Sequence, residues 1–258
     1  MRSRLVQITL LVAACVFVVP LVHGQTNVTI PQLQQVPLDS LLLMDTQQSS
    51  ARTTLDETQY VKNNDTVRVT GVVLVKPRIL TYTLARYNIF IQDTTTGQLW
   101  AGLNVLTNDT SAGAQSTGIT AVDTGDVITI TGRALEFGTQ PNSLTELYHY
   151  SASAPIFTSP EPISLVRHGS RPAPYEVTVD SFAVGTSPRP SRGEKYEGMY
   201  VVIRNVTVTS VDLSSGRFSF QDASGNSMTM YDGSGYYTLR GHKYSNSKYT
   251  PPPVGTKL

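Results

Sequence analysis

Hydrophobic and polar residues alternate with a period of two through most of residues 60–150. The alternation is clearest at 67–73, 89–91, 99–105 and 127–130, and polar turns rich in Gly, Thr and Asp separate these runs. Such alternation with one apolar face is typical of antiparallel strands in a sheet or small barrel. The apolar positions expected to fill its interior are Val67, Val69, Ile89, Ile91, Leu103, Val127 and Ile130.

The same pattern is written a second time towards the end of the chain. Val67–Val73 corresponds to Val201–Thr207, and Phe90–Gly97 corresponds to Phe218–Gly225. Asp93 and Gly125 are 32 positions apart, and Asp222 and Gly255 are 33 apart, but the second copy reaches only Leu258. Matching runs at matching spacing indicate a tandem domain. We therefore expect the second copy, residues 196–258, to lack its last strands and to form an open sheet, and the chain to be a fragment.

The order of the runs predicts a particular kind of barrel. A long first strand is followed by a hairpin, a long loop and a strand that begins with Gly-Asp at Gly125. This order is typical of the five-stranded OB fold, although another small β-sandwich would give similar periodicity. The predicted fold class is all-β, with tandem OB-fold-like barrels and the second incomplete at the C-terminus.

Three other segments are distinguished by composition. Residues 25–59 form a polar entry segment with a short strand expected at 28–30 and a helix at 38–45, and residues 153–195 form a Pro-rich connector. Residues 1–24 resemble a secretory signal peptide, with Arg2 and Arg4 before an apolar stretch. We thus expect a secreted or periplasmic protein, with no membrane association beyond the signal peptide. A rival interpretation makes Cys15 the lipid anchor of a lipoprotein.

Charge and cysteine content narrow the function classes. Cys15 is the only cysteine, so a chain processed after residue 24 has none, which excludes disulfides and thiolate metal sites. Processing also removes Arg2 and Arg4 and leaves 18 basic and 19 acidic residues, a net charge of −1. This balance argues against nucleic-acid binding by bulk electrostatic attraction.

Several motifs resemble those of a known protein family. Residues 66–73 and 90–93, the run 123–132, and residues 136–147 are similar to OB-fold modules that precede the catalytic domain of secreted bacterial nucleases. Glu194–Val201 resembles the segment that opens the next module in those proteins. Related modules also occur in large secreted Bacteroidetes-type proteins without a nuclease domain. In the nucleases the chemistry belongs to a later domain of the endonuclease/exonuclease/phosphatase type, so the resemblance implies the fold more firmly than the activity.

No arrangement of residues in the sequence is typical of an active site. His149, His168 and His242 lie far apart without ligand spacing, and no phosphate-binding or dinucleotide-binding motif is present. Asp93 and Asp222 at equivalent turns are predicted to cap their own backbone rather than to bind an ion. We therefore expect no enzymatic activity, no metal and no cofactor.

Aromatic residues supply the candidate binding surface. If Ile89, Ile91 and Leu99 face inward, Phe90 and Trp100 face outward on strands two and three, where OB domains stack bases. Neighbouring side chains that could join the surface or contact phosphates are Tyr87, Arg86, Arg78 and Lys76. In the second copy Ser219 and Thr229 take the corresponding places. The alternative is that the entry segment or the connector covers Phe90 and Trp100.

The expected function is that of a non-catalytic secreted module. It binds single-stranded nucleic acid or positions a neighbouring, downstream domain of a longer protein. The rival interpretations are a structural or cell-surface spacer that binds no nucleic acid, and a glycan-binding module, since exposed Tyr and Trp serve any flat ligand.

Overall fold

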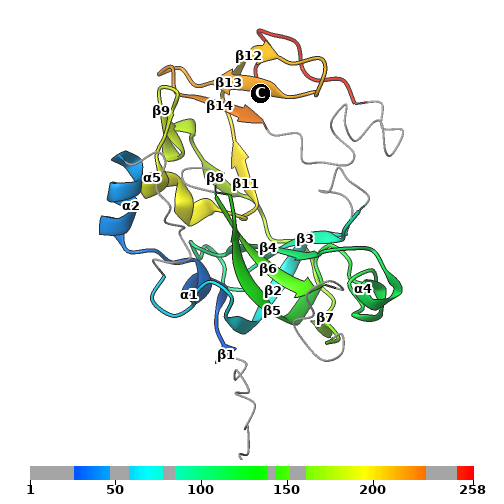
Figure 1. Cartoon of the computed structure of the whole chain (residues 1–258). Helices are drawn as coiled ribbons and strands as arrows, with labels where there is room; N and C mark the ends of the chain where they lie inside the picture. Colours follow the sequence, from blue (N-terminus) through cyan, green and yellow to red (C-terminus); the bar gives the residue numbers. More distant parts are fainter. Residues whose placement is uncertain (1–25, 47–57, 78–84, 139–142, 152–160, 231–248) are drawn as a thin grey trace, which may run out of the picture.

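Two β-rich parts make up the fold, which is described from a computed structural model. The structure describes residues 26–46, 58–77, 85–138, 143–151, 161–230 and 249–258. A barrel occupies the lower half of the view in Figure 1, and a smaller sheet that includes the C-terminus lies above it. The signal-like segment 1–24, including Cys15, lies outside the described residues.

Five strands form the barrel. They are β2 (Thr66–Val75), β3 (Asn88–Gln92), β4 (Gly102–Thr107), β5 (Val127–Phe137) and β6 (Leu144–Tyr150). Antiparallel pairing joins β2 to β3, β3 to β4, β6 to β5 and β5 back to β2, while β4 pairs with β6 in parallel. The ring is therefore closed, with α4 (Ala112–Ser116) between β4 and β5. Closure in this order is the OB arrangement, so the predicted all-β, OB-fold-like class is confirmed for the first copy.

The predicted interior residues are all buried, and all but one belong to the central cluster. Val67, Val69, Ile89, Ile91, Leu103 and Ile130 lie in it at 0–1% exposure. Val127 is also buried but stands outside the cluster, because Ile128 takes the inward position opposite Gly71. The alternation of β5 is thus shifted by one residue from the expected assignment at its start.

The entry segment is part of the barrel core rather than a separate lead-in. It contains β1 (Thr26–Asn27), which pairs with β2 in parallel, α1 (Ile30–Gln34) and α2 (Leu38–Thr46). The Thr29 hydroxyl accepts from the Gln32 backbone amide, and the Gln32 side chain accepts from the Thr29 backbone amide. This capping box begins α1 where a strand was expected. Ile30 and Leu33 of α1 are fully buried in the central cluster, so α1 plugs one end of the barrel. The predicted helix at 38–45 is present as α2.

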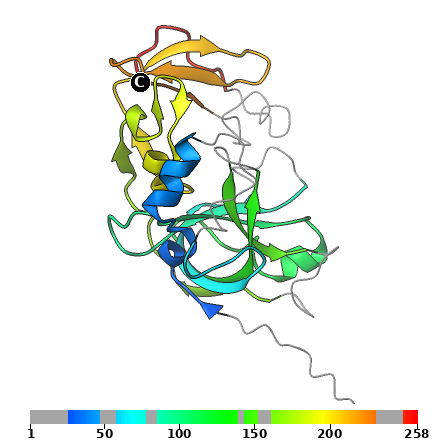
Figure 2. The ribbon, with the colours of Figure 1, turned by 60° about the vertical axis from the view of Figure 1, so that its left-hand side comes forward.

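The described part of the Pro-rich connector, residues 161–195, also contains regular structure. Its first strand, β7 (Ser164–Arg167), extends the barrel sheet by pairing with β5. The next strand, β8 (Tyr175–Val177), pairs in parallel with β11 (Val201–Ile203). Between them in sequence lie η1 (Val179–Ser181), the short pair β9 (Ala183–Val184) and β10 (Ser187–Pro188), α5 (Pro190–Gly193) and η2 (Glu194–Tyr196). Figure 2 shows α2 beside this part of the chain, where the Ser191 amide and hydroxyl of α5 bond to the Asp45 carboxylate.

The C-terminal sheet repeats a hydrogen-bond pattern of the barrel. Its strands are β12 (Thr207–Val211), β13 (Phe218–Gln221) and β14 (Ser227–Met230) in that order. The Gly255 amide donates to the Val208 carbonyl at 2.8 Å, as the Gly125 amide donates to the Val73 carbonyl at 2.8 Å. Both glycines have positive φ, +88° and +94°. Among the described residues, residues 256–258 also bond to 206–208 along the outer edge of β12. The expectation of an open sheet that begins at Val201 is therefore not confirmed, and Val201–Ile203 pairs with β8 instead.

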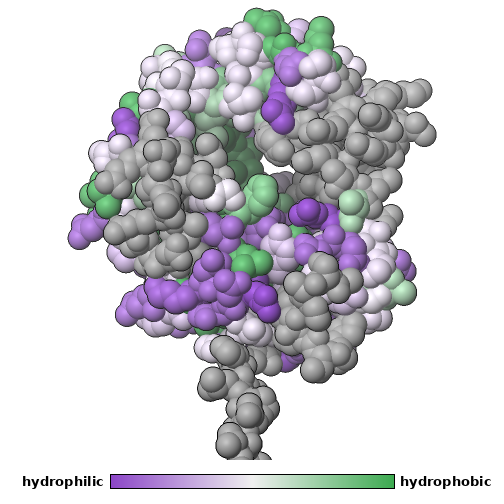
Figure 3. Space-filling model, viewed as in Figure 1, coloured by the Kyte–Doolittle hydropathy of each residue, from purple (hydrophilic) through white to green (hydrophobic). Residues whose placement is uncertain are grey.

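On the face in Figure 3, hydrophobic side chains gather in a recess between the barrel and the C-terminal sheet. Within the described ranges, no helix combines the length and apolar character needed to cross a bilayer.

Replacing Ile91 with Ala should lower the unfolding free energy by about 2–5 kcal/mol, because its side chain is fully buried in the barrel. The matched control is Leu165→Ala on β7, where the side chain is 50% exposed and the expected change is about 0.5 kcal/mol or less. Urea unfolding of the two variants measures the difference. Equal losses would contradict the assignment of Ile91 to the core.

Acid should destabilise the fold through His149. This side chain is 1% exposed, its Nδ1 lies 2.6 Å from the Thr131 carbonyl, and its Nε2 makes no hydrogen bond in the described part of the chain. Burial lowers the pKa of His149 below the ordinary 6.5. The unfolded chain therefore binds the proton more tightly, and the unfolding free energy should fall as pH drops below about 6.5.

His149→Asn removes the titration while keeping a donor for the Thr131 carbonyl. We expect this variant to lose less stability than the wild type between neutral and mildly acidic pH. Leu165→Ala is the control, because this half-exposed side chain carries no titratable group, and it should keep the wild-type loss on acidification. An unchanged acid loss in His149→Asn would show that another group carries it.

Candidate functional site

The outer face of β3, β4 and β6 carries a line of polar side chains. Register pairs Phe90 with Asn104, and Asn104 with Glu146, across the three strands. The Asn88 amide donates to Asn104, and the Asn104 amide donates to the Glu146 carboxylate at 2.9 Å. Asn88, Asn104 and Glu146 are all less than 10% exposed. This face is therefore covered, although it is the surface on which OB domains bind their ligands.

Glu146, the charged residue of this line, has Arg86 and Tyr148 as neighbours. Burial raises the pKa of Glu146, and the positive charge of Arg86 opposes that rise. Burial and the neighbouring Glu146 also raise the pKa of Tyr148, which shares a hydrogen bond with Arg86. Arg86, expected to be a phosphate contact, thus lies near the Glu146 carboxylate and the Tyr148 phenol of the barrel.

Trp100 does not stand on a strand. Since β4 begins at Gly102, the expectation that Trp100 projects outward from a strand is wrong. Its residue lies in the β3–β4 connection with a φ of +62°, and its ring packs against Val36, Leu41 and Met44 from the entry segment. This packing agrees with the alternative interpretation, in which the entry segment covers Trp100.

The remaining candidates are dispersed. Phe90 is partly buried on the outer face of β3, whereas Tyr87 is 4% exposed in a separate cluster with Ala114 and Ile119. Lys76 is exposed, and Arg78 lies outside the described residues. The structure does not bring Phe90, Trp100 and Tyr87 onto one stacking surface.

The expected correspondence between Trp100 and Thr229 is wrong. The outward pair Phe90–Asn104 of the barrel corresponds to Ser219–Thr229, whose hydroxyls lie 2.8 Å apart. Thr229 thus corresponds to Asn104 and not to Trp100, because the β13–β14 turn is shorter than the β3–β4 connection. The second copy has no counterpart of the loop that holds Trp100.

A segment of the chain itself lies against this side of the barrel. Residues 194–200, here called the docking segment, contact the barrel at four points. The Trp100 amide donates to the Lys195 carbonyl at 2.8 Å, and the Tyr200 amide donates to the Gln92 side chain at 3.0 Å. The Thr145 amide donates to the Glu197 carboxylate at 2.9 Å.

The fourth contact is a close approach of two glycines. A Cβ at Gly102 would lie 2.1 Å from the Gly198 carbonyl carbon, a distance that no side chain can occupy. Gly198 itself has a φ of +65°, in the left-handed region that favours glycine. The two glycines therefore allow the docking segment to touch the backbone of β4 directly.

Three carboxyl groups meet where the docking segment crosses the barrel. Burial raises the pKa of Glu197 well above its ordinary value, and the negative charges of Glu194 and Glu136 raise it further. Hydrogen bonds from the Thr145 amide and from the Gln34 side chain oppose the rise. The Gln34 amide also donates to the Gly102 carbonyl, which links α1 to the same contact.

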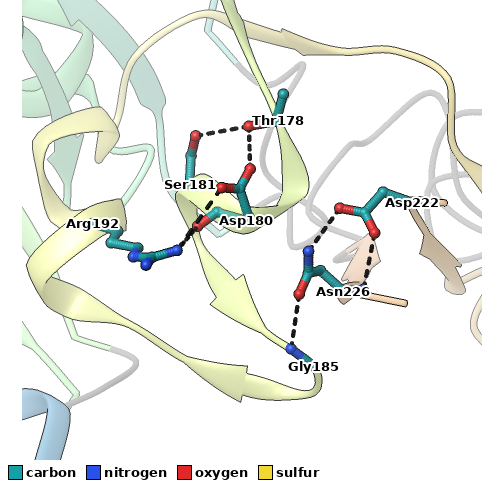
Figure 4. A network of polar contacts seen from close by, with 7 residues as sticks. All are labelled: Thr178, Asp180, Ser181, Gly185, Arg192, Asp222 and Asn226. Atoms are coloured by element: carbon teal, nitrogen blue, oxygen red, sulfur yellow. Dashed lines mark hydrogen bonds and ion pairs between the residues drawn. The ribbon is translucent and has the colours of Figure 1, made fainter. Parts of the chain in front are cut away.

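Polar turns join the connector to the C-terminal sheet (Figure 4). The Asp222 carboxylate accepts from the amides of Ser224 and Asn226, so it caps its own turn, as Asp93 does by accepting from the Thr95 amide. The Asn226 side chain then accepts from the Gly185 amide at 3.0 Å. These bonds hold the β13–β14 turn against the β9–β10 turn. The cap expected at both aspartates is confirmed.

Metal-binding chemistry finds no support in the described ranges. No group of three or more His, Cys, Asp or Glu is arranged there to hold an ion. The functional feature that sequence reasoning missed is the docking segment. Its signal was the Glu194–Val201 motif, whose Glu197 and Gly198 make two of the four contacts with the barrel.

Comparison with known proteins adds little. No known protein family and no curated protein matches the sequence. Among solved structures, the chain is similar to an aspartyl-tRNA synthetase-like protein from Leishmania major Friedlin, with 11% sequence identity and a TM-score of 0.32. The match covers 66% of this chain, and the chain spans about a quarter, 26%, of that protein. A superposition this loose carries no argument about function.

Glu197→Gln should flatten the pH dependence of stability. Because the pKa of Glu197 is raised in the folded chain, the folded form binds the proton more tightly than the unfolded form. The unfolding free energy of the wild type should therefore fall as pH rises from the ordinary carboxyl pKa through the raised value. Glutamine keeps an acceptor for the Thr145 amide and carries no charge.

The variant should lose less stability than the wild type as pH rises towards neutral, measured by urea unfolding at several pH values. Glu176→Gln is the control, since that exposed carboxylate lies on β8 beside Arg204 and away from the barrel. A variant with the same pH dependence as the wild type would show that Glu197 is ionised at no cost.

Proposed function

We propose that this chain is a non-catalytic OB-fold module of a secreted protein, and that it positions a neighbouring domain of a longer chain. The observation that carries the proposal is the docking segment on the β3–β4 side of the barrel. Four contacts fix it there, including the Gly102–Gly198 approach. The barrel therefore acts as a rigid base for the part of the chain that comes after the docking segment.

The path of the chain supports a positioning role. Immediately after the docking segment the chain enters β11, which pairs with β8, and then the C-terminal sheet. Immediately before it, α5 is hydrogen-bonded to Asp45 of α2. Contacts on both sides of the segment favour a fixed orientation of the C-terminal sheet over a flexible tether.

Nucleic-acid binding on the usual OB face has less support. The outer polar line Asn88–Asn104–Glu146 is buried, and the charge of Arg86 lies near Glu146 and Tyr148. With a net charge of −1 after removal of residues 1–24, the chain also lacks the counterion-release contribution that dominates nonspecific affinity.

A titration with oligothymidylate at low salt tests this proposal. Trp100 is the only tryptophan, so its fluorescence reports directly on the β3–β4 connection. We expect no saturable change in Trp100 emission and no mobility shift, because the outer polar line of the barrel is buried and the net charge of the chain is close to zero. Saturable quenching that weakens as salt is added would overturn the proposal and favour a nucleic-acid-binding module.

A further inference from the structure

A cavity opens beside Trp100, between α2, residues 59–60 and the α5–η2 part of the connector. Its volume is about 420 Å³, within the range of small-molecule sites. Val36 and Leu41 form an apolar wall next to the indole, while Tyr60 on the rim is 55% exposed. We call this cavity the Trp100 pocket.

The backbone at Trp100 is unusual for a bulky residue. Its φ of +62° lies in the left-handed region, which aromatic residues seldom adopt. The bond from its amide to the Lys195 carbonyl, 2.8 Å long, holds this conformation. Strained residues of this kind cluster at binding and catalytic sites. This backbone conformation places the indole in the wall of the pocket. An extended strand conformation would direct the side chain elsewhere.

Polar groups around the pocket have hydrogen-bonding capacity to spare. The side chains of Gln35, Gln59 and Tyr60 are exposed and make no hydrogen bond within the described part of the chain. Two amides and a phenol together offer both donors and acceptors. By contrast, the polar groups on the outer face of β3 and β4 are already paired with one another.

The lining selects a ligand that is both apolar and hydroxylated. Lys195 is the one charged side chain of the described lining, and its ammonium lies 5.2 Å from the centre of the Tyr196 ring. A single cation of this kind gives little attraction for a phosphate backbone. Aromatic faces with neutral amides and a phenol instead match a sugar ring, which has an apolar C–H face and a rim of hydroxyls.

We propose that the Trp100 pocket binds a pyranose unit of a glycan, with the sugar ring against Trp100 and Tyr60 and its hydroxyls bonded to Gln35 and Gln59. This adds a ligand to the positioning module without using the outer face of the barrel. A module held on a carbohydrate surface would place its neighbouring domain there.

Titration with cellohexaose, xylohexaose, mannohexaose and chitohexaose tests the proposal on the full chain. At least one should give a saturable change in Trp100 emission, with matching heat in calorimetry. Tyr60→Ala should weaken that binding by about fivefold to tenfold through the loss of one aromatic contact. Gln59→Ala should weaken it by about twofold to tenfold through the loss of one hydrogen bond. Phe137→Ala is the matched control, because Phe137 is a 63% exposed aromatic residue elsewhere on the barrel and should leave binding unchanged.

Both test residues are exposed, so the variants should fold, and an unchanged melting temperature confirms it. If none of the four saccharides changes the emission at millimolar concentration, the proposal is wrong. Binding that survives both Tyr60→Ala and Gln59→Ala would place the sugar elsewhere and also overturn it. Binding of oligothymidylate that both variants weaken would assign the pocket to a nucleic acid instead.

Discussion

The backbones of Gly102 and Gly198 touch, and the arrangement of the two β-rich parts depends on that contact. A Cβ on Gly102 would meet Gly198 at 2.1 Å, so a side chain there would push the docking segment away from the barrel. The hydrogen bonds from Trp100, Thr145 and Tyr200 all fall within a few residues of this point. The close approach brings these donors within reach of their acceptors, and a segment held further out would lose them together.

This contact has an electrostatic cost that the surrounding residues offset in part. Glu197 comes close to Glu194 and Glu136 in a partly buried place, and its carboxyl therefore retains a proton more readily. The Thr145 amide and Gln34 provide hydrogen bonds that compensate some of the burial. The docking segment thus carries an unfavourable electrostatic contribution to stability. This agrees with a role in fixing the orientation of the C-terminal sheet rather than in stabilising the barrel.

Local alternation was enough to predict the strands of the barrel and most of the residues that face its core. Val67, Val69, Ile89, Ile91, Leu103 and Ile130 face the core because strand periodicity decides the face once one side is buried. The sequence could not show that Ile30 and Leu33 complete that core, since α1 reaches it through the folded chain and not through a neighbouring strand. Trp100 was misplaced because apolar residues at Leu99 and Ala101 imitate a strand, whereas the connection turns through a left-handed residue before β4 begins. The docking segment depends on contacts between residues 52 to 108 positions apart, which no local pattern encodes.

Amide hydrogen exchange at Trp100, Thr145 and Tyr200, in the wild type and in Gly102→Ala, tests the central claim most directly. These amides donate to Lys195, Glu197 and Gln92, one group on each side of the contact. If the docking segment is fixed on the barrel, all three should be protected in the wild type and should lose protection together in the variant, while Ile91 and Leu103 in the barrel stay protected. Rapid exchange of the three amides in the wild type, or unchanged protection in Gly102→Ala, would contradict the account.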